Sequence, residues 1–199
     1  MWFFRRPSDA TVASFFAAQS LMPLSYHAAG ASRGTDWPDG FNHDRNSVRL
    51  GSGEAVFLKA CAALREWRMF PGSWTMIYPA GALQSEGNCV GLLMRVFGLW
   101  WLNALRIVYE VDDDGNSSGG TVKRRVGFAY GTLPGHVESG EERFTVVWLT
   151  DDSVHYELHA FSRPRYWMVK LAKPVARALQ RRFVRQSLAA MQQATRGNA

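Results

Sequence analysis

Cysteine and long apolar runs are scarce in this sequence, and each scarcity excludes a class of protein. Cys61 and Cys89 are the only cysteines among 199 residues, too few for a disulfide framework and without the spacing of a zinc site. In the most apolar stretch, residues 90–109, the longest uncharged run has ten residues, about half the length of a membrane-spanning helix. We therefore expect a soluble, cytoplasmic protein with reduced cysteines.

Motifs for nucleotide binding and for nucleophilic catalysis are also missing. The sequence has no glycine-rich loop of the P-loop or dinucleotide-binding type, and it has no Gly-x-Ser-x-Gly turn. Gly51 and Gly53 open a predicted helix but form no larger motif. We expect no cofactor and no metal, and the sequence names neither a substrate nor a reaction.

Acidic residues are absent from the C-terminal part of the chain. No Asp or Glu follows Glu157, whereas nine Lys and Arg residues do, so the net charge of +6 comes from this segment alone. Such asymmetry is typical of proteins that meet nucleic acid or an anionic lipid surface, but a solvated helix face explains it more simply. We expect no nucleic acid partner, and a membrane surface ranks behind a small apolar molecule. The oligomeric state stays open.

The pattern of apolar residues predicts an α+β protein. Helical spacing indicates three helices: one at about 8–20, one that begins after a cap at Ser52, and one at about 174–193. In the last of these, Val175, Leu179 and Phe183 should face inward. Six segments rich in β-branched and aromatic residues, separated mostly by short turns, predict antiparallel strands at 74–78, 89–97, 105–111, 125–132, 143–149 and 154–161. A further short strand is expected at 47–50.

These elements predict one domain, residues 1–199, with the helix-grip layout. An N-terminal helix (about 8–20) and a loop (21–46) precede a helix-grip core (47–193), in which a curved antiparallel sheet of six to seven strands wraps a long C-terminal helix. One helix does not fill the concavity of such a sheet, so we expect an internal cavity beneath it. A loop as long as 21–46 is often functional.

The densest motif spans residues 127–144 and reads GFAYGTLPGHVESGEERF. It closely resembles the signature of an uncharacterised bacterial and plant family described as domain of unknown function nineteen-ninety. Other matching segments are HDR at 43–45, LGSGE at 50–54, ALREW at 63–67, GLWW at 98–101 and FSRP at 161–164. The resemblance covers about residues 24–190 and implies a fold similar to the START/Bet v 1-like helix-grip proteins. It implies no activity.

Polar residues of the motif form one candidate site. His136, Glu138, Glu141 and Glu142 lie in and beside a tight turn, and a histidine beside carboxylates suits general acid–base catalysis. A hairpin turn with solvated charges explains the same residues, and a partner surface or a metal site remain weaker alternatives. Among these residues, His136 and Glu142 are the catalytic candidates, together with Tyr130.

Alternation along the strands indicates which side chains would line the cavity. Glu142 shares a face with Phe144, and Phe128 shares one with Tyr130. We also assign Arg106 to the inner face, where a buried guanidinium needs a partner, either Glu142 or Glu110. The predicted ligand-binding set is Arg106, Phe128, Tyr130, Glu142 and Phe144. The row of His155, Glu157 and His159 could hold a metal, but exposed polar alternation is the simpler explanation.

Three functions compete. The first is a binding module with an apolar cavity for a lipid-like or aromatic small molecule. The second is a cavity-based enzyme of cyclase, hydrolase or isomerase type that uses His136 and Glu142 as acid–base groups. The third is an interaction protein whose basic C-terminal helix meets an anionic surface, and it ranks last because charge alone supports it.

Overall fold

The structure is a computed structural model that describes residues 1–115, 120–165 and 173–196. The helices are α1 (Asp9–Gln19), α2 (Glu54–Arg65) and α4 (Lys173–Thr195), with a short 3-10 helix η1 (Ala31–Arg33). The strands are β1 (Trp2–Phe3), β2 (Asn42–Ser52), β3 (Thr75–Tyr78), β4 (Cys89–Val96), β5 (Leu99–Asp113), β6 (Val122–Thr132), β7 (Glu138–Leu149) and β8 (Ser153–Pro164).

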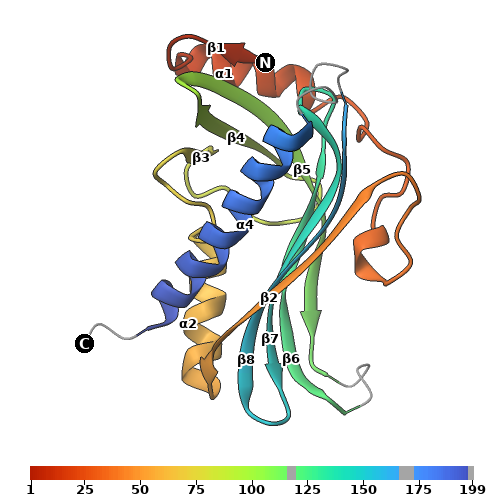
Figure 1. Cartoon of the computed structure of the whole chain (residues 1–199), viewed down its shortest axis with the longest axis vertical. Coiled ribbons are helices and arrows are strands. Elements are labelled where there is room, and N and C mark those ends of the chain that lie inside the picture. Colours follow the sequence, from red (N-terminus) through yellow and green to blue (C-terminus); the bar gives the residue numbers. More distant parts are fainter. Residues whose placement is uncertain (116–119, 166–172, 197–199) are drawn as a thin grey trace.

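One curved antiparallel sheet carries the fold. Its strand order is β2-β8-β7-β6-β5-β4-β3, and β1 pairs with the part of β5 that extends past the end of β6. The long helix α4 runs along the concave side of this sheet (Figure 1). The α+β prediction and the helix-grip layout are therefore confirmed, with β1 as an additional strand that the sequence analysis missed.

Local sequence explains where the helices begin. Ser8 caps α1, since its side chain accepts a hydrogen bond from the backbone N–H of Thr11 at 3.2 Å. The predicted cap of α2 was wrong, because Gly53 is the N-cap residue, and the hydroxyl of Ser52 instead accepts from Arg49 at 2.8 Å. Among the described residues, no helix combines the length and apolar character that crossing a membrane requires.

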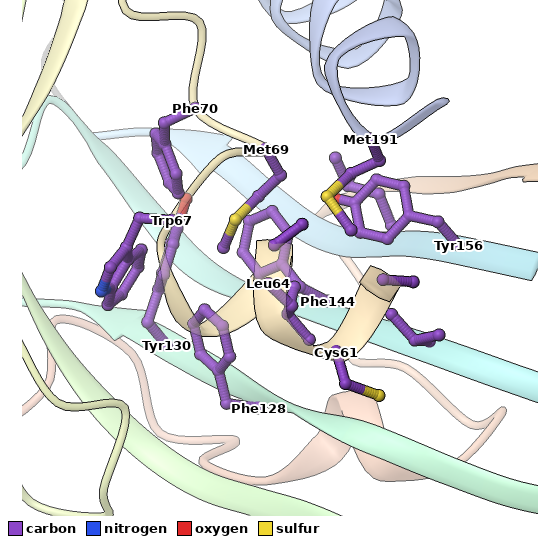
Figure 2. Packing of buried hydrophobic residues seen from close by; sticks show 14 of the residues in the cluster. Cys61, Leu64, Trp67, Met69, Phe70, Phe128, Tyr130, Phe144, Tyr156 and Met191 are labelled. Atoms are coloured by element: carbon purple, nitrogen blue, oxygen red, sulfur yellow. The ribbon is translucent and has the colours of Figure 1, made fainter. Parts of the chain in front are cut away.

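The concave face of the sheet is packed with aromatic side chains from the end of α2. Trp67 adopts a left-handed conformation (φ 59°) that ends the helix, and the chain then turns so that Trp67, Met69 and Phe70 lie against the sheet (Figure 2). Phe70 lies 5.9 Å from the ring of Phe144 and 5.3 Å from that of Phe183 on α4. These residues occupy much of the space that we expected to be a cavity.

Helix α4 is anchored unevenly on this core. Met191, near its C-terminal end, is fully buried, and the hydroxyl groups of Ser187 and Tyr156 lie 2.9 Å apart. Phe183 is only half-buried, and Val175 is 44% exposed, so the prediction that Val175 faces inward was wrong. The N-terminal half of α4 therefore depends on polar contacts with the sheet.

The outer, convex face of the sheet has two separate coverings. Helix α1 packs on β4 and β5 through Val12, which clusters with Leu93 and Leu102. Residues 24–41, which we call the strap, cross the outer face of β5 to β8. They bury Tyr26 and Trp37 against Phe161. Figure 1 shows the strap on the opposite side of the sheet from α2 and α4.

The contact between α1 and the sheet yields a first prediction. A Cβ atom added at Gly91 of β4 would overlap the ring of Phe16, which stacks on Tyr78 with a 5.6 Å centroid distance. We expect Gly91→Ala to lower the free energy of unfolding by about 1–3 kcal/mol, because the ring must leave its position. Gly72→Ala is the control, since a Cβ there meets no atom within 4 Å. Equal urea midpoints for the two variants would show that Phe16 moves freely.

Candidate functional site

A row of polar side chains crosses the concave face under the N-terminal half of α4. The register aligns Asp44 of β2 with Ala160 of β8, Glu142 of β7 and Tyr130 of β6. Residues directly opposite one another on neighbouring strands point to the same face of the sheet. Three strands thus bring two carboxyl groups and a phenol to the concave face, next to the aromatic cluster that contains Phe144.

Tyr130 and Glu142 form the centre of this row. The hydroxyl group of Tyr130 donates a short hydrogen bond to Oε2 of Glu142. Burial raises the pKa of Glu142 to about 7, and the charges of Glu138 and Asp44 add to this effect against the opposing influence of the Tyr130 bond. Burial also keeps the pKa of Tyr130 well above its usual value, so the phenol remains a donor at neutral pH.

Helix α4 is held over this row by two polar contacts. The guanidinium of Arg177 donates to both carboxylate oxygens of Asp44, at 2.6 and 2.8 Å. One turn further on, Nε2 of Gln180 donates to the carboxyl group of Glu138 at 2.7 Å and to Ser162 at 3.2 Å. Burial raises the pKa of Glu138 as well. The face of α4 above the site is therefore fixed in position by side chains that also surround Glu142.

The structure brings together four of the five predicted ligand-binding residues. Phe128, Tyr130, Phe144 and Glu142 all lie on the concave face, as alternation predicted. Phe128 and Phe144 are fully buried and stack on each other with a 5.4 Å centroid distance, so they belong to the packed core of the sheet.

The assignment of Arg106 to the inner face was wrong. Arg106 lies opposite Gly131, on the outer side, and its guanidinium donates to the carbonyl oxygens of Ser20 and Met22 at 2.7 and 3.0 Å. It therefore does not pair with Glu142. Its neighbour Ile107 lies opposite Tyr130 and occupies the inner face in its place.

Comparison with known proteins identifies the family. Residues 25–190 match the family model described as "Domain of unknown function (DUF1990)". The chain belongs to this family. A UPF0548 protein of Dictyostelium discoideum is 35% identical over 214 aligned residues, which cover 100% of this chain and 97% of the relative.

A comparison with solved structures finds matches at low sequence identity. The hypothetical protein jhp0584 from Helicobacter pylori matches with a TM-score of 0.53 and 16% identity, over 82% of this chain and 96% of that one. Human STARD10 matches with a TM-score of 0.45 and 10% identity, over 94% of this chain and 80% of that one. The likeness to the Helicobacter pylori protein concerns the fold alone.

Residues 127–144, the densest motif of the family resemblance, form the second half of β6, the following turn and the first half of β7. His136 lies in that turn, where its Nδ1 accepts a hydrogen bond from the backbone N–H of Glu138 at 2.9 Å. Burial lowers the pKa of His136 to about 4, so the ring is neutral at pH 7. Within the described residues, no hydrogen bond joins His136 to the Tyr130–Glu142 pair, and its part in catalysis remains a prediction.

Sequence reasoning did not find the polar centre on the outer face. Glu141, the neighbour of Glu142, is 2% exposed and accepts hydrogen bonds from Tyr26 Oη at 2.6 Å, Gly30 N at 2.8 Å, and both the N–H, at 3.0 Å, and the hydroxyl of Ser32. All these donors belong to the strap. Glu141 therefore attaches the strap to β7, and the two adjacent glutamates serve opposite faces of the sheet.

The histidine row on β8 also lies on the outer face, and each member has a partner there. His155 contacts Ser153 at 3.1 Å, Glu157 accepts from Thr145 at 3.3 Å, and Nδ1 of His159 lies 2.7 Å from Nη2 of Arg143. In the part of the chain that the structure describes, no three His, Cys, Asp or Glu side chains are grouped to hold a metal ion.

Proposed function

We propose that the protein binds a small molecule with an apolar body and a hydroxyl group, between α4 and the concave face of the sheet, with the hydroxyl at the Tyr130–Glu142 pair. Half-buried Glu142 and Phe183 would contact the ligand from β7 and from α4. Phe70, whose ring centre lies 6.4 Å from that of Tyr130 and 5.3 Å from that of Phe183, would form the apolar floor.

The observation that carries this proposal is the unequal bonding of two neighbouring carboxyl groups. Glu141 accepts hydrogen bonds from four donor groups, whereas Glu142 accepts one, from Tyr130, within the described residues. A carboxyl group in an apolar face is costly unless its hydrogen bonds are made. Structural glutamates are satisfied by their own chain, as Glu141 is. Glu142 has capacity for a further partner.

The charge state of Glu142 favours a hydroxyl group as that partner. With a pKa of about 7, both the ionised and the protonated forms are populated at neutral pH. A hydroxyl group donates to the ionised form and accepts from the protonated form, so it suits both. A second candidate function, general acid–base catalysis by the same pair, is favoured by this pKa as well, because efficient acid–base groups titrate near the working pH.

Binding of octan-1-ol and of its methyl ether, followed by calorimetry, tests the proposal. We expect the wild type to bind the alcohol about tenfold more tightly than the ether, since only the alcohol donates a hydrogen bond to a charged group. Tyr130→Phe should keep the core packing and reduce this preference, and Glu142→Gln should do the same. Glu66→Gln, at an exposed site paired with Arg68, is the control that should change nothing.

Two results would contradict the proposal. One is the absence of saturable binding of either compound by the wild type, and the other is an alcohol preference that survives in Glu142→Gln. A thermal melt of each variant without ligand separates loss of binding from loss of folding.

A further inference from the structure

A hollow lies beside the strap, away from the Tyr130–Glu142 pair. It has a volume of about 710 Å³ and is lined by Ser25, Gly40, Asn42, Ser139, Arg163, Pro164 and Arg165. The two ends of the strap, at Ser25 and Gly40, form one side of it. The start of β7 and the end of β8 form the other, near the upper end of the sheet in Figure 1. A volume of this size suits a small organic molecule rather than a single ion.

The charged residues that line the hollow are all positive. Arg163 and Arg165 are both exposed and contribute two guanidinium groups, and none of the lining residues is a carboxylate. The nearest acidic neighbour along β7, Glu138, points to the concave face and is bonded to Gln180. Negative charge on a ligand in this hollow would therefore meet no opposing carboxylate among the lining residues.

Arg163 is held in place without an ion pair. Its guanidinium carbon lies 4.5 Å from the centre of the Phe41 ring, at the end of the strap. In the described ranges, no carboxylate lies within ion-pair distance of Arg163. Stacking fixes the plane of the guanidinium and leaves its N–H groups available, which is the arrangement that binds oxyanions in a bidentate manner.

Neutral polar groups complete the lining. Asn42 also lines the hollow at the start of β2, although its side chain shares the concave face with Ser162 and Asp44. Ser139 is buried, and its hydroxyl donates to the carbonyl oxygen of Ser25 at 2.9 Å, which joins the strap to β7 at the base of the hollow. The hollow thus combines an oriented cation with a fixed wall.

We propose that this hollow binds a small molecule through a phosphate or carboxylate group, with Arg163 as the contacting residue. The site is independent of the proposed pocket at Glu142, since β7 presents Ser139 and Glu142 to opposite faces. The oxyanion belongs either to a soluble metabolite or to a lipid headgroup, and the two sources are separated by experiment.

Titration of the full chain with glycerol 3-phosphate and with vesicles containing phosphatidic acid tests this site. We expect saturable binding to at least one of the two probes, weakened about tenfold or more in Arg163→Ala because a charge-assisted contact is lost. Arg45→Ala is the matched control, since Arg45 is also exposed and lies 4.5 Å from the ring of Trp37, but outside the hollow. It should bind as the wild type does.

Arg163→Lys provides a second variant that keeps the positive charge but loses the planar guanidinium that binds oxyanions in a bidentate manner. It should weaken the same binding several-fold at an unchanged melting temperature. Binding of glycerol 3-phosphate identifies a soluble ligand, whereas binding to the vesicles alone identifies a headgroup. The proposal is overturned if the wild type binds neither probe, or if Arg163→Ala and Arg45→Ala weaken binding equally.

Discussion

Replacing Glu141 by glutamine is expected to lower the free energy of unfolding by about 3–5 kcal/mol, the range found when a buried charged group loses its partners. The carboxylate of Glu141 accepts from Tyr26, from Gly30 and twice from Ser32. A glutamine side chain presents an N–H₂ group to some of these donors, so buried donors are left facing a donor. The strap should then detach from the outer face before the rest of the sheet unfolds.

Chemical denaturation together with hydrogen exchange measures this effect. In the variant, the backbone N–H groups of Gly30 and Ser32 should lose their protection from exchange. The backbone N–H groups of β6, a central strand of the sheet, should keep theirs. Glu157→Gln is the control, because Glu157 also lies on the outer face but accepts a single hydrogen bond of 3.3 Å from Thr145. Equal denaturation midpoints for the two variants would mean that Glu141 does not secure the strap.

Glu142→Gln is expected to become more stable relative to the wild type as pH rises. Folding raises the pKa of the Glu142 carboxyl from 4.5 to about 7, so the folded state binds this proton more tightly than the unfolded state. The resulting stabilisation is present in full at low pH and is lost as pH rises from the lower value to the higher one. The difference between variant and wild type should therefore grow by about 2 kcal/mol between about pH 5 and about pH 8.

Comparing the two proteins isolates Glu142 from the buried histidines. Burial lowers the pKa of His136 and of His159 to about 4, and the charge of Arg143 adds to the shift of His159. These rings act in the opposite direction, because their folded forms resist protonation as pH falls below 6.5. Their contribution is the same in both proteins and cancels. A stability difference that stays constant over this pH range would show that Glu142 titrates normally.

Much of the sheet could be predicted from the sequence because side-chain direction in a strand repeats every two residues. Phe128, Tyr130, Glu142 and Phe144 were placed on one face by this rule alone, and the structure confirms it. The filling of the concavity was not predictable in the same way. Trp67 ends α2 with a positive φ, a conformation uncommon for a bulky residue, and the sequence around it reads as a continuing helix.

The errors in the site have two physical causes. Leu105 and Ile107 are the inward residues of β5, and the register shifts between Ile107 and Tyr109, so Tyr109 lies on the outer face opposite Ala129. Alternation does not fix which of two faces is inner, and a bulge reverses the assignment along one strand. The role of Glu141 depends on the strap, whose donors lie more than a hundred residues away in the chain.

Glu141 and Glu142 are neighbours on β7 but point to opposite faces of the sheet. This arrangement restricts where members of the family can gain or lose residues. Inserting or deleting one residue between the start of β7 and Phe144 would exchange the faces of Glu141 and Glu142, leaving the strap without its acceptor and placing a carboxylate with few donors on the outer side. The ends of the hairpins carry no such constraint. Insertions and deletions in relatives should therefore be found at the turns between strands, and the first half of β7 should keep a constant length.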